Sequence, residues 1–98
     1  MKIYITCNAA MSTGILQMRL QEEAAKRGLD MTFQAMAYTE LDHHYDEADM
    51  VLCSPQIRFM FNSIKEKMGN KPVMQISVSD FGLMNAPKIM DDILKAIK

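Results

Sequence analysis

Residues 2–27 have the sequence KIYITCNAAMSTGILQMRLQEEAAKR, in which two different hydrophobic patterns follow each other. Residues 2–6 form a short apolar run, which is typical of a buried strand. Residues 12–27 carry apolar side chains three or four positions apart, which predicts an amphipathic helix. Its main row consists of Leu16, Leu20 and Ala24, with Ile15 and Met18 beside it. The stretch therefore predicts a strand that ends near Cys7, a loop of small residues, and a helix.

The rest of the chain repeats this change between short apolar runs and helical patterns. Four strands are predicted, at residues 2–6, 31–36, 49–53 and 72–77. Helices are predicted at residues 12–27, at 54–69 and from 86 onward, with a shorter one at 39–45. Ser54 and Pro55 offer an N-cap and a first helical residue to the helix at 54–69. Strands and helices therefore alternate along the whole chain.

This alternation predicts an α/β fold with one four-stranded parallel sheet and helices on both of its faces. Right-handed crossovers leave few topologies, and we expect the strand order 2-1-3-4. Residues 1–98 are expected to form a single domain around one core. In such a sheet, ligands bind beyond the carboxyl ends of the strands, at the point where the winding reverses. Cys7 is predicted to lie at that point.

The composition excludes several classes of function. A net charge of −1 provides no basic surface to attract nucleic acid or anionic lipid. No apolar run approaches the roughly 20 residues that span a membrane. Two cysteines do not make a disulfide framework, so we expect reduced thiols in the cytoplasm.

Cys7 and the residues after it form the candidate functional motif. A thiol at the N-terminus of a helix lies near positive backbone dipoles, which favour the thiolate. The small residues let the loop curl, so that its N–H groups point inward, and two hydroxyl groups add further donors. Such a cradle holds a tetrahedral anion beside a nucleophilic sulfur. The predicted phosphate-binding residues are Asn8, Ala9, Ala10, Met11, Ser12, Thr13 and Gly14.

Two interpretations of this motif stay open on the residues alone. In the functional one, the Cys7 sulfur attacks phosphorus, and backbone donors hold the resulting phosphocysteine. In the structural one, Cys7 is a small buried hydrophobic residue and Ser12 is only an N-cap.

The motif lacks the arginine that a cysteine phosphatase needs. In such a phosphatase, an arginine six positions after the cysteine grips the phosphoryl oxygens through a bidentate fork. Here that position is Thr13, and the next arginine is Arg19, more than a helical turn later. A hydrolase also needs a general acid for its leaving group and a positioned water. The pattern therefore favours a carrier that receives a phosphoryl group and passes it on.

Over essentially its whole length, the chain resembles enzyme IIB of the sugar phosphotransferase system, of the lactose/cellobiose (oligo-β-glucoside) type. The likeness rests on Cys7 followed by Met-Ser-Thr at residues 11–13, and on Pro-Gln-Ile at residues 55–57. The sequence departs from that family at two positions of the loop, Ala10 and Gly14, where glycine and serine are expected.

The resemblance implies a role, partners and a location. In that family the cysteine accepts a phosphoryl group from a histidine of the IIA component. It then transfers the group to a sugar bound in the membrane-embedded IIC component. The resemblance also implies the architecture of low-molecular-weight tyrosine phosphatases and a cytoplasmic location with transient membrane association through IIC. No cofactor, metal or nucleic acid is expected.

Two competing functions make different predictions. A low-molecular-weight cysteine phosphatase or arsenate reductase would use the same loop architecture, and it would hydrolyse an aryl phosphate at steady state. A non-catalytic module that binds anions or another protein would carry no covalent phosphate. Thr13 in place of arginine argues against the first of these.

Several polar residues are expected on the same rim as Cys7. Gln56 and Arg58 begin the helix after the third strand. There, contact with a partner or a phosphoryl group and an exposed structural role are equally open. Asp80 follows the fourth strand, and a turn before the last helix is the favoured interpretation.

Three further side chains are expected to have structural roles. Cys53 ends the strand that neighbours the first one, so a redox pair with Cys7 is conceivable, but a buried thiol is favoured. His43 and His44 stand among carboxylates in ELDHHYDEAD, residues 40–49. Adjacent helical residues do not face each other, so a solvated acidic surface is favoured over a metal site or phosphohistidine chemistry.

Overall fold

The computed structural model describes residues 1–8 and 10–97, without the side chains of residues 10–12. The strands are β1 (Lys2–Cys7), β2 (Thr32–Ala37), β3 (Met50–Cys53) and β4 (Val73–Gln75). The α-helices are α1 (Ala10–Lys26), α2 (Phe61–Met68), α3 (Val78–Gly82) and α4 (Ala86–Ala96). Two 3-10 helices, η1 (Leu41–His43) and η2 (Pro55–Met60), lie on either side of β3 in the sequence.

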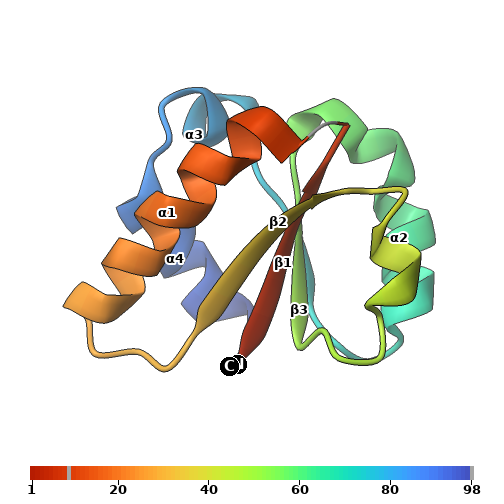
Figure 1. Ribbon diagram of the computed structural model, residues 1–98, viewed down its shortest axis with the longest axis horizontal. Helices are drawn as coiled ribbons and strands as arrows, with labels where there is room; N and C mark the ends of the chain where they lie inside the picture. The colour runs from red at the N-terminus through yellow and green to blue at the C-terminus, as the bar shows by residue number, and fades with distance from the viewer. Residues whose placement is uncertain (9, 98) are drawn as a thin grey trace.

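The four strands form one parallel sheet in the order β2-β1-β3-β4, which confirms the predicted fold class and topology. β1 is central, and its Thr6 is in register with Met36 of β2 and with Cys53 of β3. Helices α1, α3 and α4 lie on one side of the sheet and α2 on the other (Figure 1). The chain therefore winds away from β1 in both directions, as the predicted order requires.

The sheet separates two hydrophobic cores, where the chain length suggested one. Side chains alternate between the two faces of a strand, and successive residues of β1 and β3 therefore enter different cores. The core beneath α1 and α4 includes Ile3, Ile5, Met50 and Leu52. The core beneath α2 includes Tyr4, Val51 and Cys53. This alternation fixes which side chains of the two strands can meet.

The predicted helix at residues 54–69 is divided into two elements. Ile57 has non-helical dihedral angles, φ −119° and ψ 27°, which separate the 3-10 turns of η2 from the α-helix α2. Ser54 occupies the N-cap position, but its side chain accepts no capping hydrogen bond there. Gly69 ends α2 with a positive φ of 64°, a conformation that glycine adopts without strain.

Two other helical boundaries differ from the sequence-based prediction. The first helix begins at Ala10 in place of residue 12, so the loop after β1 is shorter than expected. The turn expected around Asp80 is the short helix α3, because the Ser77 hydroxyl accepts a hydrogen bond from the Asp80 N–H at 3.1 Å. The short helix expected at 39–45 contains only the three residues of η1.

Candidate active site

Cys7 is the last residue of β1 and lies at the carboxyl edge of the sheet, between β2 and β3. The Tyr38 N–H donates to the Cys7 carbonyl at 2.9 Å, which fixes the end of β1 against the end of β2. In Figure 1 the tip of β1 lies beside the start of α1 and beside η2. The structure therefore places Cys7 at the predicted switch point.

The Cys7 thiol is paired with the hydroxyl group of Thr13. The Cys7 Sγ and Thr13 Oγ1 atoms are 3.1 Å apart, and both side chains are fully buried. Because α1 starts at Ala10, Thr13 is in its first turn and faces the sheet. A thiolate has no proton to donate, so in the ionised site the hydroxyl must be the donor. Thr13 thus holds a hydroxyl donor at the position where a phosphatase would hold a guanidinium.

The first turn of α1 supplies backbone donors next to Cys7. The first four N–H groups of an α-helix have no acceptor within the helix, and the helix dipole adds positive potential there. Residues 10–13 are in this turn and not in a preceding loop, which corrects the predicted loop path. The backbone donors available next to Cys7 are thus mainly helical N–H groups, where the sequence suggested those of a loop.

The remaining predicted phosphate-binding residues differ in where they lie and in how far the structure describes them. Asn8 is exposed immediately after β1, and Gly14 is half-buried within α1. Ala9 lies outside the described residues, as do the side chains of Ala10, Met11 and Ser12. Cys7 itself has no exposed surface, so its sulfur must become accessible before it can react with a group on another molecule.

Cys53 lies on the other side of the sheet from Cys7. It shares a core with Tyr4 and Val51, whereas Cys7 continues the row of Ile3 and Ile5 on the opposite face. Burial raises the pKa of the Cys53 thiol to about 12. The two sulfurs therefore do not form a redox pair, and Cys53 is the buried structural thiol that the sequence favoured.

The predicted rim residues surround the carboxyl edge of the sheet. Gln56 and Arg58 are exposed on η2, so both are accessible to a partner. Asp80 is in the first turn of α3, and its carboxylate lies 3.8 Å from the Lys88 ammonium. Asp80 thus lies in a short helix and not in the turn that the sequence favoured. Sequence reasoning did not single out Phe59, an exposed aromatic side chain beside these residues.

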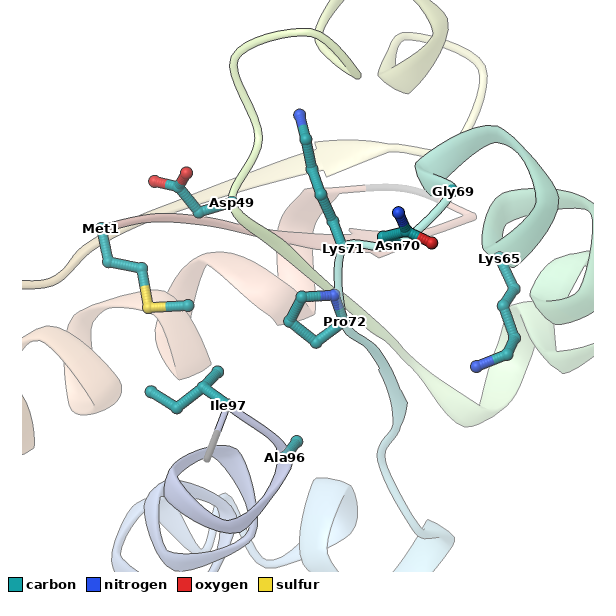
Figure 2. Close-up of a pocket in the computed structure, with 9 residues that line it drawn as sticks. All are labelled: Met1, Asp49, Lys65, Gly69, Asn70, Lys71, Pro72, Ala96 and Ile97. Carbon is teal, nitrogen blue, oxygen red and sulfur yellow. The ribbon is translucent and has the colours of Figure 1, made fainter.

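A cavity of about 690 Å³ lies at the opposite edge of the sheet (Figure 2). Met1, Asp49 and Pro72, which line it, precede β1, β3 and β4, so the cavity is far from Cys7. The Lys71 ammonium at its wall donates to the carbonyls of Tyr45 and Asp46 at 3.0 and 3.1 Å. This cation is already used in holding the loop before β3, and the cavity has no part in the site.

The acidic segment at residues 40–49 is tied to the sheet through Glu47. The Tyr4 hydroxyl donates to Glu47 Oε1 at 2.6 Å, and the Lys2 ammonium lies 3.2 Å from Glu47 Oε2. His44 Nδ1 also contacts this carboxylate. These hydrogen bonds, led by that from Tyr4, lower the pKa of Glu47 to about 2, while burial and Glu47 raise that of Tyr4 to about 12. The sequence analysis favoured a solvated acidic surface for this segment. The structure differs, because Glu47 is bonded to side chains of β1.

We expect Glu47 to make the stability of the fold depend on acid pH. A carboxyl group whose pKa is lower in the folded chain contributes stability above its ordinary pKa of 4.5, and this contribution is lost as the pH falls toward 2. Glu47→Gln should lower the urea midpoint of unfolding at pH 7, and its midpoint should converge with that of the wild type near pH 2. Glu66→Gln, at an exposed position on α2, is the control. A constant difference between Glu47→Gln and wild type across this range would contradict the assignment.

Within residues 1–8 and 10–97, no helix has the length and apolar character needed to cross a membrane. In the same part of the chain, no cluster of three histidine, cysteine or carboxylate side chains is placed to hold a metal ion.

Comparisons with known proteins identify a matching family and similar structures. A family model described as "PTS system, Lactose/Cellobiose specific IIB subunit" matches residues 2–92. The chain is 28% identical over 95 residues to the galactose-specific EIIB component of the PTS system from Lactococcus lactis subsp. cremoris. That alignment covers 90% of this chain and 88% of the relative.

Two solved structures share the fold. The solution structure of the cellobiose-specific phosphotransferase IIB component from Borrelia burgdorferi is 34% identical, with a TM-score of 0.77. It covers 98% of this chain and 90% of its own. The lactose-specific IIB component domain from Streptococcus pneumoniae has a TM-score of 0.80 over 100% of this chain and 98% of its own. At 19% identity, this second likeness shows the fold alone.

Proposed function

The chain belongs to the lactose/cellobiose-specific IIB family of the sugar phosphotransferase system, and we propose that it carries a phosphoryl group on Cys7. The group comes from a phosphohistidine of the IIA component and goes to a sugar bound in the membrane component IIC. The main support is the contact of 3.1 Å between Cys7 Sγ and the Thr13 hydroxyl, at the first turn of α1.

The proposed reaction has two in-line displacements at phosphorus. In the first, an S–P bond forms as the N–P bond of the phosphohistidine breaks, and its electron pair returns to the imidazole, which takes up a proton. In the second, a sugar oxygen forms an O–P bond as the S–P bond breaks. The thiolate is regenerated, and the hydroxyl proton passes to a base of the acceptor or to solvent. The N–H groups of α1 bind the phosphoryl oxygens between the two steps.

The charges around the site favour a carrier over a hydrolase. The chain has three arginines, Arg19, Arg27 and Arg58, and none follows Cys7 at the phosphatase spacing. Arg27 is engaged with Glu23 and Asp91 at 2.7 and 2.9 Å. Arg19 is exposed on α1, beyond the turn that contains Thr13. A thiophosphate without a guanidinium clamp is held less tightly, which suits onward transfer.

The surface around the carboxyl edge suits brief contacts with two partners. Phe59 on η2, Val78 at the start of α3 and Leu83 just after α3 expose between 65% and 76% of their surface. Exposed apolar surface gathered at one edge of a protein is typical of interaction sites. We therefore expect the IIA and IIC components to dock in turn on this edge, in the cytoplasm and transiently at the membrane. Because the sugar is bound by IIC, we expect specificity for it to lie there.

The test is direct phosphorylation of the wild-type protein. It is incubated with IIA that has been phosphorylated by the upstream components, and the intact mass and peptide masses are then measured. We expect one phosphoryl group, on the peptide that contains Cys7. No covalent phosphate would support a binding module, and steady-state hydrolysis of an aryl phosphate would support a phosphatase. Phosphate on another residue would show that the wrong nucleophile was assigned.

We expect Thr13→Val to slow the transfer to this protein. Valine has nearly the shape of threonine but removes the hydroxyl donor 3.1 Å from Cys7 Sγ. A hydrogen bond to a charged group contributes about 1.5–3 kcal/mol, which corresponds to a rate that is about 10- to 150-fold lower. Thr13→Ser, which keeps the hydroxyl, is the matched control. The measurement is the rate of phosphocysteine formation by rapid quench, and an unchanged rate in Thr13→Val would exclude a role for the hydroxyl.

A further inference from the structure

Ser54 is a buried polar residue to which neither the fold nor the proposed reaction assigns a role. Its side chain is fully buried, and its hydroxyl oxygen has no hydrogen-bond partner among the described residues. The capping bond that the sequence suggested is absent. A buried hydroxyl without a partner carries an uncompensated desolvation cost, so its presence at this position calls for an explanation.

The register of the sheet places Ser54 next to Cys7. Thr6 pairs with Cys53, and the Ser54 N–H donates to the Thr6 carbonyl at 3.0 Å, so the ladder between β1 and β3 continues to this residue. The next two residues in register are therefore Cys7 and Ser54. The dihedral angles of Ser54, φ −70° and ψ 158°, are extended, so the alternation of side chains also continues.

This alternation puts both side chains on the same face of the sheet. On β3, Met50 and Leu52 enter the core beneath α1, and Ser54 follows them at the next alternate position. On β1, Cys7 follows Ile5 in the same way. Neighbouring strands are about 4.8 Å apart, so the hydroxyl and the thiol are adjacent in one row, under the first turn of α1.

The backbone of Ser54 is held from both sides. Its carbonyl accepts hydrogen bonds from the Ile57 N–H at 3.2 Å and from the Gln75 side-chain amide at 3.0 Å. With the backbone N–H also engaged, only the hydroxyl of this residue is left to interact with a ligand. Donors fixed in this way interact with a new charge without the cost of reorganising the site.

We propose that Ser54 binds the phosphoryl group on Cys7 by donating its hydroxyl hydrogen bond to a phosphoryl oxygen. This inference rests on the proposed function of Cys7. The phosphoryl group adds three acceptor oxygens beside the sulfur, and one of them supplies the partner that the hydroxyl lacks. Ser54 therefore stabilises the protein with phosphorylated Cys7 and not the unphosphorylated protein.

The test compares Ser54→Ala with Thr6→Val, whose hydroxyl is equally buried and also has no partner in the described chain. Thr6 precedes Cys7, and its side chain follows Tyr4 on the opposite face of the sheet. Each variant is equilibrated with phosphorylated IIA, and the fraction of phosphocysteine is measured by intact mass. Ser54→Ala should shift the equilibrium about tenfold toward IIA, the effect of losing one hydrogen bond to a charged group. Thr6→Val should leave it unchanged.

A second measurement separates binding from folding. Unphosphorylated Ser54→Ala should be at least as resistant to thermal unfolding as the wild type, because it removes a polar group without a partner. If Ser54→Ala fails to fold, Ser54→Gly replaces it in the equilibrium experiment.

Three results would contradict the proposed role of Ser54. An equilibrium within twofold of the wild type for Ser54→Ala would overturn the inference, and a buried water would then be the partner of the hydroxyl. An equal shift in Thr6→Val would overturn it as well. Absence of phosphate on Cys7 in the wild type would overturn both this inference and the proposed function.

Discussion

Cys7→Ser is expected to lower the rate of phosphoryl transfer by at least ~10³-fold while leaving the fold intact. A serine hydroxyl is almost entirely un-ionised near pH 7, whereas a cysteine is partly thiolate and is intrinsically a better nucleophile. The Thr13 hydroxyl donates or accepts a hydrogen bond at 3.1 Å, but it is no general base that could deprotonate serine. Replacing sulfur by oxygen at the end of β1 changes little packing, so circular dichroism and the unfolding temperature should stay close to wild-type values.

The matched control for this variant is Cys53→Ser. Cys53 is equally buried, but it is on the other face of the sheet and its pKa is raised to about 12. We expect Cys53→Ser to accept phosphate from IIA at a near-normal rate, with some loss of stability because a hydroxyl replaces a thiol in an apolar core. Both rates come from the same rapid-quench experiment with phosphorylated IIA. Transfer to Cys7→Ser combined with none to Cys53→Ser would reverse the assignment of the two thiols.

The strand order and the position of Cys7 could be predicted because they depend on local patterns. Short apolar runs that alternate with helical periodicity permit few topologies, and the end of β1 is marked by the change of pattern at Cys7. The presence of the Thr13 hydroxyl near Cys7 could likewise be anticipated, since a hydroxyl near a helix start is a local signal. Its contact with the sulfur depends on where α1 begins, and element boundaries are the least reliable part of a sequence-based prediction.

Ser54 shows why the rest of the site could not be predicted. The sequence Ser-Pro before an apolar row is a strong helix-start signal, and it suggested a capping hydroxyl. The break at Ile57 makes the following segment a 3-10 helix, and the capping bond is absent. The adjacency of Ser54 and Cys7 depends on the register between β1 and β3, which are more than forty residues apart in the sequence. Pairing of this kind is a tertiary property that no local pattern contains.

Leu20→Ala is expected to cause the largest loss of stability among the substitutions considered for α1. Leu20 is fully buried and packs in the core with Ile3 and Ile5 of β1. Truncating a buried leucine removes its transfer free energy and leaves a cavity, which together cost about 2–5 kcal/mol of unfolding free energy. For a domain of about 100 residues, this corresponds to an unfolding temperature lower by more than ~10 °C. The measurement is thermal or urea unfolding of the unphosphorylated protein.

Met18→Ala on the same helix is the matched control, and it also tests how the periodicity was interpreted. The sequence placed Met18 and Ile15 beside the row of Leu16, Leu20 and Ala24. The structure leaves 62% of Met18 and 52% of Ile15 exposed, whereas the row itself has no exposed surface. Met18→Ala therefore removes few contacts and replaces methionine by the best helix former, so the free energy of unfolding should change by less than ~0.5 kcal/mol. If Met18→Ala lost as much stability as Leu20→Ala, the side of α1 that carries Met18 and Ile15 would have to be covered in solution, for example by a second molecule.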